Sequence, residues 1–126
     1  MTTLDEALVE IRDAVAALVY QDGQGGNIRA TADPGHINPP AVWVQLGDTE
    51  HTLASGAVVQ AFHLWLIAST SDTIEAVRQI DRLRRSIVGQ GALFWPDNPA
   101  SWLPLQLPGD VKPLPALRLT IRTRVE

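Results

Sequence analysis

The chain has 126 residues and a mass of 13.7 kDa, with 45% hydrophobic and 19% charged residues. These values are typical of one folded domain and exclude an intrinsically disordered chain. The net charge of −4 and the sequence pI of about 5.2 argue against a protein whose main task is to grip nucleic acid. The absence of cysteine excludes a disulfide framework, a thiolate metal site and a cysteine nucleophile, and it fits a reducing compartment.

The N-terminal segment predicts an amphipathic helix. Residues 3–6 match a capping box, and apolar residues recur at helical spacing from Leu4 through Tyr20. We therefore expect a helix of about 17 residues. The first residues lack the basic start and apolar core of a secretory signal. Periodicity then disappears from residue 21 to residue 40, where glycines and prolines predict a long loop with a short strand at Ile28–Thr31.

Two strands are predicted next, at Ala41–Gly47 and Ala57–Ala68. The second is apolar on both parities, which predicts a strand in the middle of the sheet with both of its faces covered. The link between them, residues 48–56, is too long for a tight hairpin turn and is expected to project.

A second helix is predicted from Asp72, where another capping signature begins, to a stop near Gly89 or Gly91. One helical face is apolar, and its members are Ile74, Val77, Ile80, Leu83, Ile87 and Val88. The other face carries Arg78, Arg82, Arg84 and Arg85. Arginines late in a helix suit the negative end of the helix dipole.

The C-terminal third begins with a proline-rich segment, residues 93–115, which predicts an edge strand or extended arm around Trp102–Leu107. A final strand, Leu117–Val125, alternates between an apolar face and a face with Arg118, Thr120, Arg122 and Arg124. The elements predict a single α+β domain over residues 1–126, with a mainly antiparallel or mixed sheet and two helices packed on one face. The other sheet face is then expected to be covered by the long loops, by another subunit, or by both.

The residue patterns predict no catalytic residue, no cofactor and no metal site, and hence a protein that is not an enzyme. The glycines of residues 22–27 are not followed by the Lys-Ser/Thr of a phosphate loop, and they come after a helix. His36, His51 and His63 lack the spacing of a helical zinc pair. Ser69 lies outside any GxSxG elbow. The most apolar run is too short to span a bilayer, so no membrane contact is expected.

The arginines of the last strand are the unexplained feature of this acidic chain. They could form a solvated face that blunts a sheet edge. They could also pair with acidic groups of the chain's own loops or of a neighbouring subunit, because arginine suits bidentate carboxylate pairing. Nucleic-acid binding would require interleaved aromatic residues, but Thr120 occupies that position. An acidic chain with a basic patch is self-complementary head to tail, the geometry that closes rings.

The order of elements resembles that of the tail-terminator proteins of long-tailed, non-contractile bacteriophages, and more loosely that of other small phage neck and tail-completion proteins. The resemblance covers nearly the whole chain. It is carried by the segments LDEALVEIRDAVAALV, PPAVWVQLG, FHLWLIAS, SDTIEAVRQIDRLRRSI and PALRLTIRTRV.

The resemblance implies a structural virion protein that forms a homo-hexameric ring. The ring would cap the tail tube, stop its polymerisation and join it to the head-tail connector protein. It would lie in the tail or neck of the virion after assembly in the host cytoplasm, and DNA would pass through it without sequence-specific binding.

For this ring we predict interface residues in three places. Arg118, Arg122 and Arg124 are expected to contact another subunit or the tube. Trp95 and Trp102 are expected to be apolar anchors, since tryptophan is enriched at interface hot spots. The loop 48–56, with Asp48 and Glu50, is expected to reach the next ring or the connector. The simpler alternatives are a rim charge, a core aromatic residue and a solvent loop.

An alternative function stays open. The chain could be a small α+β ligand-binding or protein-interaction domain that acts as a monomer or dimer. In that case a groove beside Trp43, Trp65 and His63 would hold the ligand.

Overall fold

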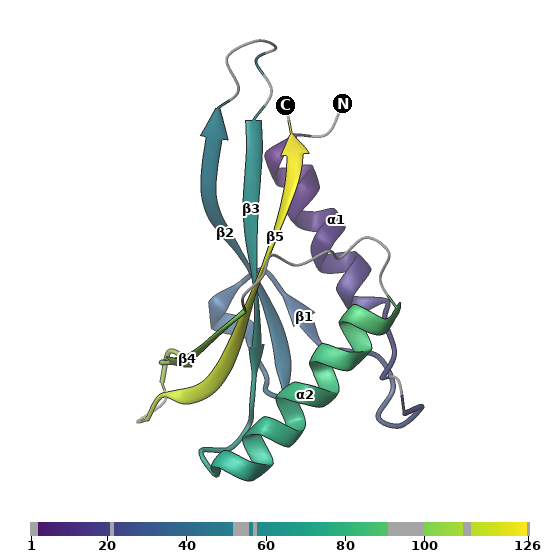
Figure 1. The fold of residues 1–126 in the computed structure, drawn as a ribbon, viewed down its shortest axis with the longest axis vertical. Coiled ribbons are helices and arrows are strands. Elements are labelled where there is room, and N and C mark those ends of the chain that lie inside the picture. Colours follow the sequence, from purple (N-terminus) through teal and green to yellow (C-terminus); the bar gives the residue numbers. More distant parts are fainter. Residues whose placement is uncertain are drawn as a thin grey trace.

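The computed structural model describes residues 3–20, 22–51, 56, 58–90, 100–109 and 112–125. The helices are α1 (Leu4–Ala16), α2 (Thr73–Gln90) and a short 3-10 helix η1 (Pro34–His36). The strands are β1 (Ala30–Thr31), β2 (Ala41–His51), β3 (Val58–Ile67), β4 (Ser101–Leu105) and β5 (Leu114–Val125). Both long helices lie on one side of the sheet (Figure 1), so the predicted α+β class is confirmed.

The strands form one mixed sheet in the order β1-β2-β3-β5-β4. β1 runs parallel to β2, and the other neighbours are antiparallel. β3 is the central strand, as its apolar character on both parities predicted. β4 is an edge strand and contains Pro104, which fits the rule that a residue without an N–H group is tolerated at a sheet edge.

The main core lies between the sheet and the helices. α1 packs against β1 and β2 and lies beside the end of the sheet that carries the β2–β3 hairpin, whereas α2 packs against β3 and β5 at the other end (Figure 1). Phe62, Leu64 and Leu66 project from β3 into this core, where they pack with Val15 of α1 and Ile80 of α2. Each of these side chains is almost fully buried, which contributes about 1.5–3 kcal/mol apiece.

α1 is shorter than the sequence predicts, because it ends at Ala16 and not at Tyr20. After it the chain folds back on itself: the Ile28 N–H donates to the Leu18 carbonyl at 2.8 Å, and the Tyr20 N–H donates to the Gly26 carbonyl at 3.3 Å. Tyr20 is therefore buried by this return and not by a continued helix. The expected capping box is also absent, since the Thr3 hydroxyl donates to the Asp5 carboxylate at 2.6 Å and makes no cap hydrogen bond.

α2 has the predicted position but buries a narrower face. Ala76, Ile80, Leu83 and Ile87 form the buried stripe. The rest of the predicted apolar face is at the surface, namely Ile74, Val77 and Val88. The spacing of the stripe keeps one side of the helix against β3 and β5, and the apolar residues beside the stripe stay at least 43% exposed.

The β2–β3 hairpin is longer than predicted and extends beyond the helices (Figure 1). β2 continues to His51, and the register shifts between Leu46 and Thr49. Gln60 is buried at this shift, and its amide donates to the Gly47 carbonyl at 2.9 Å and to the Ala61 carbonyl at 2.8 Å. The Gln60 amide thus gives two carbonyl groups a donor beside the irregular register.

The second face of the sheet is covered in part by the chain itself. Trp65 and Ile67 of β3 are buried there together with Leu107, which follows β4. Ile37 and residues of β2, β4 and β5 pack around them. The chain's own loops, one of the two expected coverings of this face, therefore cover part of it near β4.

Candidate interaction surfaces

The second sheet face carries a polar ladder where β3 pairs with β5. His63 lies opposite Thr120, Trp65 opposite Arg118, and Ala61 opposite Arg122. These arginines are half-buried or exposed, whereas the main core lies on the other side of the sheet. Alternate residues of a strand share a face, so the odd-numbered residues of β3 and the even-numbered residues of β5 lie together here.

The aromatic part of this face is organised by its own contacts. Trp43 stacks on Trp65 with ring centroids 6.2 Å apart, and the Trp65 indole N–H donates to Gln45 at 2.8 Å. His63 Nδ1 lies 3.0 Å from the Thr120 hydroxyl. Partial burial lowers the pKa of His63 below its usual value, and the positive charges of Arg118 and Arg122 lower it further, against the opposite effect of Asp48.

Arg118 and Arg122 have partners within the chain. The Arg118 guanidinium lies 5.7 Å from the Trp65 ring centroid. Arg122 Nη1 lies 3.5 Å from Glu50 Oε1, an exposed ion pair made diagonally across the sheet. The ladder therefore contacts an acidic residue of its own hairpin, one of the two acidic contacts open from the sequence. Such an exposed pair contributes about 0–1 kcal/mol, so exchanging it for another partner costs little.

The remaining predicted interface residues are spread over the molecule. Arg124 lies opposite Val59 near the hairpin, on the same face as Arg122. Asp48 lies at the register shift of β2. Trp102 lies on edge strand β4 with 53% of its surface exposed. Trp95 and the tip of the predicted projecting loop, residues 52–55, lie outside the described residues.

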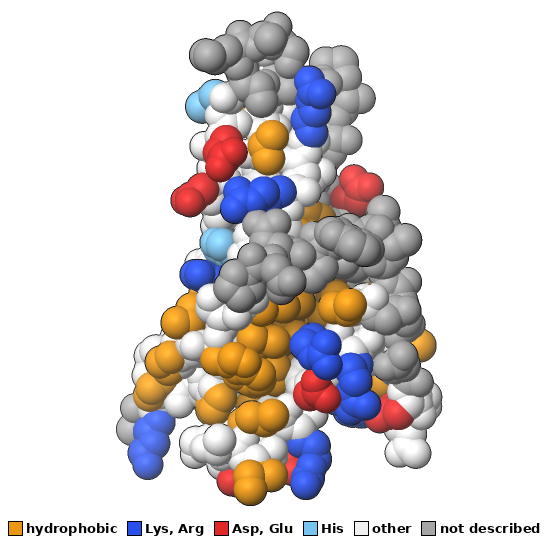
Figure 2. Space-filling model, viewed as in Figure 1, with side chains coloured by type: hydrophobic (Ala, Val, Ile, Leu, Met, Phe, Trp, Pro, Cys, Tyr) orange, Lys and Arg blue, Asp and Glu red, His pale blue; other side chains and the backbone are white. Residues whose placement is uncertain are grey.

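An apolar groove of about 370 Å³ lies between the start of α2 and edge strand β4. Its lining residues are Ser71, Thr73, Trp102, Leu103, Pro104, Pro113, Pro115 and Ala116. Figure 2 shows hydrophobic side chains gathered on this part of the surface, with charged side chains beside them. Sequence reasoning found Trp102 but not the groove, because its other wall comes from a helix start distant in the sequence.

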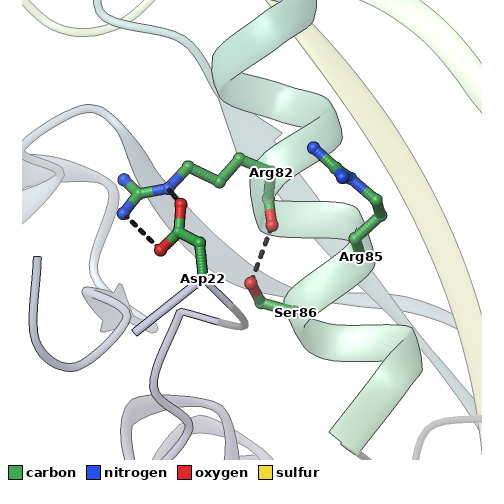
Figure 3. Close-up of a pocket in the computed structure, with 4 residues that line it drawn as sticks. All are labelled: Asp22, Arg82, Arg85 and Ser86. Carbon is green, nitrogen blue, oxygen red and sulfur yellow. Dashed lines mark hydrogen bonds and ion pairs between the residues drawn. The ribbon is translucent and has the colours of Figure 1, made fainter. Parts of the chain in front are cut away.

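A smaller pocket of about 250 Å³ lies where α2 meets the turn after α1 (Figure 3). Arg82 Nε lies 2.7 Å from one carboxylate oxygen of Asp22, and Arg82 Nη2 lies 2.9 Å from the other. This bidentate pair lowers the pKa of Asp22 to about 2. The Arg82 guanidinium also lies 3.8 Å from the Tyr20 ring centroid. Arg85 does not reach Asp22 and pairs with Asp81 instead.

The Asp22–Arg82 ion pair in this pocket joins the turn after α1 to α2. Gly25 has a φ of +91°, and a Cβ atom there would lie 3.3 Å from Arg82 Nη2. Gly25 thus lets the turn approach α2 closely, which gives one of these glycines a structural role.

Over the described ranges, no three histidine or acidic side chains gather closely enough to hold a metal ion. No helix in the same part of the chain combines the length and apolar character needed to cross a membrane. Comparison with protein-family models, with curated proteins and with solved structures finds no match to this chain.

Proposed function

We propose that the protein is a structural subunit that assembles with copies of itself into the ring of a phage tail terminator. The observation that carries this proposal is the apolar groove at the β4 edge, where Trp102 is more than half exposed. Contiguous apolar surface of this kind marks protein–protein contacts, and tryptophan is enriched among residues that dominate their binding energy. An edge strand also leaves backbone groups unpaired for a neighbour.

The polar ladder supplies a second contact of a different kind. Arg118, Arg122 and Arg124 lie on one face of the sheet, and the pairing of Arg122 with Glu50 is exposed and weak. In the assembled ring these arginines contact acidic groups of another subunit or of the tail tube. The hairpin, with Asp48 and Glu50 toward the turn end of β2, reaches the adjoining ring or the connector.

The place of the ring in the virion follows from the resemblance in element order. The ring, a hexamer, caps the tail tube in the neck and joins it to the head-tail connector after assembly in the host cytoplasm. The net charge of −4 supports this role, because DNA must pass through such a ring without adhering to it.

The test is co-assembly with the tail-tube protein. We expect capped tubes of fixed length in electron micrographs, and tubes that keep growing in the presence of the protein would contradict the proposal. Arg122→Glu should leave the far-UV circular dichroism spectrum unchanged and abolish ring formation. The matched control is Arg29→Glu, the same charge change at an exposed loop position, which should assemble normally.

A ligand-binding or protein-interaction domain remains the alternative proposal. The observation that favours it is the Trp43 indole N–H, which is buried without an acceptor among the described residues. A ligand carbonyl reaching this donor would raise the melting temperature of a stable monomer or dimer. A ligand-dependent melting shift, together with a mass in light scattering that never exceeds a dimer, would support this function over the ring.

A further inference from the structure

The two long helices differ in charge although they cover the same side of the sheet. α1 carries four acidic residues and one arginine, whereas α2 carries four arginines and two acidic residues. The two helices lie beside different halves of the sheet (Figure 1), so the charges are separated along the molecule. One side of the subunit therefore has an acidic part and a basic part.

The outer face of α2 combines basic and apolar side chains. Ile74 and Val77 are exposed, by 71% and 43%. Arg78 lies one turn after Ile74, where it pairs with Glu75 at 3.3 Å, and Arg85 lies two turns further along the same side of the helix. Arg85 and Arg84 share a single carboxylate, that of Asp81, at 3.0 and 2.7 Å. Two guanidinium groups on one carboxylate leave this face with an excess of positive charge.

The outer face of α1 has the opposite charge around an apolar residue. Val9 is 44% exposed, with Glu6 one turn before it and Asp13 one turn after it on the helix surface. Glu10 lies one turn beyond Glu6 on the same side of Val9, and Arg12 lies on the other side. No described side chain forms an ion pair with Glu6 or Glu10, whereas Asp13 pairs with Arg12 at 2.9 Å. Two carboxylates beside an exposed valine match the composition of the α2 face with the sign of the charge reversed.

We propose that the outer face of α2 in one copy binds the outer face of α1 in the next copy. In this contact Val9 packs against Val77 and Ile74, and Glu6 and Glu10 meet Arg78 and Arg85. The occupant is a second copy of the chain because the complementary acidic face is on the chain itself. This inference rests on the proposed function, for which it supplies the contact between neighbouring subunits.

The contact joins two different faces, so it is heterologous. Every added copy presents one free α1 face and one free α2 face, and the series closes into a ring when the rotation between copies allows it. Charge complementarity of this kind fixes which faces meet and raises the rate of association, and it weakens as salt is added.

Disulfide trapping tests the contact directly, because the chain has no cysteine of its own. A Val9→Cys/Val77→Cys variant, oxidised alone and in the presence of tail tubes, should give a ladder of linked species on non-reducing gels. Each single variant should stay monomeric on the same gels. The control is Val9→Cys/Asn38→Cys, which moves the second cysteine to an exposed loop outside α2 and should give no ladder.

Two results would overturn the inference. The first is a linked dimer from either single variant, which would indicate pairing of like faces. The second is the absence of a ladder from the Val9→Cys/Val77→Cys variant both alone and on tubes, which would leave these faces to another partner.

A charge exchange gives an independent readout. Arg78→Glu with Arg85→Glu should lower the yield of disulfide-linked oligomers roughly tenfold, and so should Glu6→Arg with Glu10→Arg. Combining all four changes should restore it, because opposite charges then face each other again. Failure of the combined variant to recover, with a normal circular dichroism spectrum, would count against the contact.

The trapping result is separable from the terminator role. If the linked oligomers form but the tubes grow without limit, the helix contact is supported and the role in capping is rejected. If the tubes are capped but no linked oligomers form, the role in capping is supported and the contact between α1 and α2 is rejected.

Discussion

Arg82 joins α2 to the turn after α1 through several contacts. It pairs with Asp22, donates to the Gln24 carbonyl and covers the Tyr20 ring. The sequence places it among four arginines of one helix with nothing to distinguish it from the others. Its role comes from the close approach of the turn after α1, which Gly25 permits.

The Asp22–Arg82 pair is expected to make the stability of the fold depend on pH. The pKa of Asp22 falls from 3.8 to about 2 because the folded state holds its ionised form against Arg82. A carboxylate with a lowered pKa stabilises the fold fully above its unfolded value, and this stabilisation is lost as the pH falls through the folded value. Asp22→Asn should therefore unfold at lower urea than the wild type at pH 7, and the two midpoints should converge toward pH 2.

Arg82→Gln is the matched control for that pH dependence and should behave as Asp22→Asn does. A difference in urea midpoint that stays constant from pH 7 to pH 2 would show that the ionised carboxylate does not stabilise the fold.

The β2–β3 hairpin has a glycine, Gly47, at a position where a larger side chain would collide with its neighbours. Gly47 lies at the register shift, where a Cβ atom would be 2.8 Å from His63 Nε2 and 3.2 Å from the Ala61 backbone carbonyl. The imidazole is held in place by Thr120 on the next strand. A side chain at position 47 would therefore push against both β3 and the ladder on the second face.

Gly47→Ala should lower the free energy of unfolding by about 1–3 kcal/mol, the usual cost of inserting a methyl group into a packed site. The cost should be smaller in a His63→Ala background, where the nearest atom is removed. A double-mutant cycle from chemical denaturation measures this coupling. If the effects of Gly47→Ala and His63→Ala on the free energy of unfolding are additive, the added methyl group does not collide with His63.

At the scale of the whole molecule, the sheet is covered unequally on its two faces. Among the described residues, one face packs against both helices, whereas the second packs against a smaller cluster that includes Leu107 and Ile37. The groove and the polar ladder lie on the less protected parts of the subunit. Trp102 in the groove and Arg122 in the polar ladder are both exposed.

Trp102→Ser separates assembly from folding. More than half of this side chain is exposed, so its loss should change the free energy of unfolding by no more than about 1 kcal/mol. Ring formation should fall sharply, because the groove loses its largest apolar side chain. Sedimentation and co-assembly with tubes measure the effect.

Trp65→Ser is the contrasting variant, since Trp65 is buried on the second face and its loss should cost about 3–5 kcal/mol. Normal ring formation by Trp102→Ser would remove the β4 groove from the interface.

The sequence by itself determined the elements and the fold class. Helical spacing placed α2, alternation placed β5, and the doubly apolar run placed β3 at the centre, because each signal is a local property of the chain. The tertiary structure alone decided where α1 stops, which side of α2 is buried, and that Arg122 meets Glu50. These depend on a turn that folds back, on how the helices lie on the sheet and on a register shift in β2. Such contacts join residues far apart in sequence, so no local periodicity encodes them.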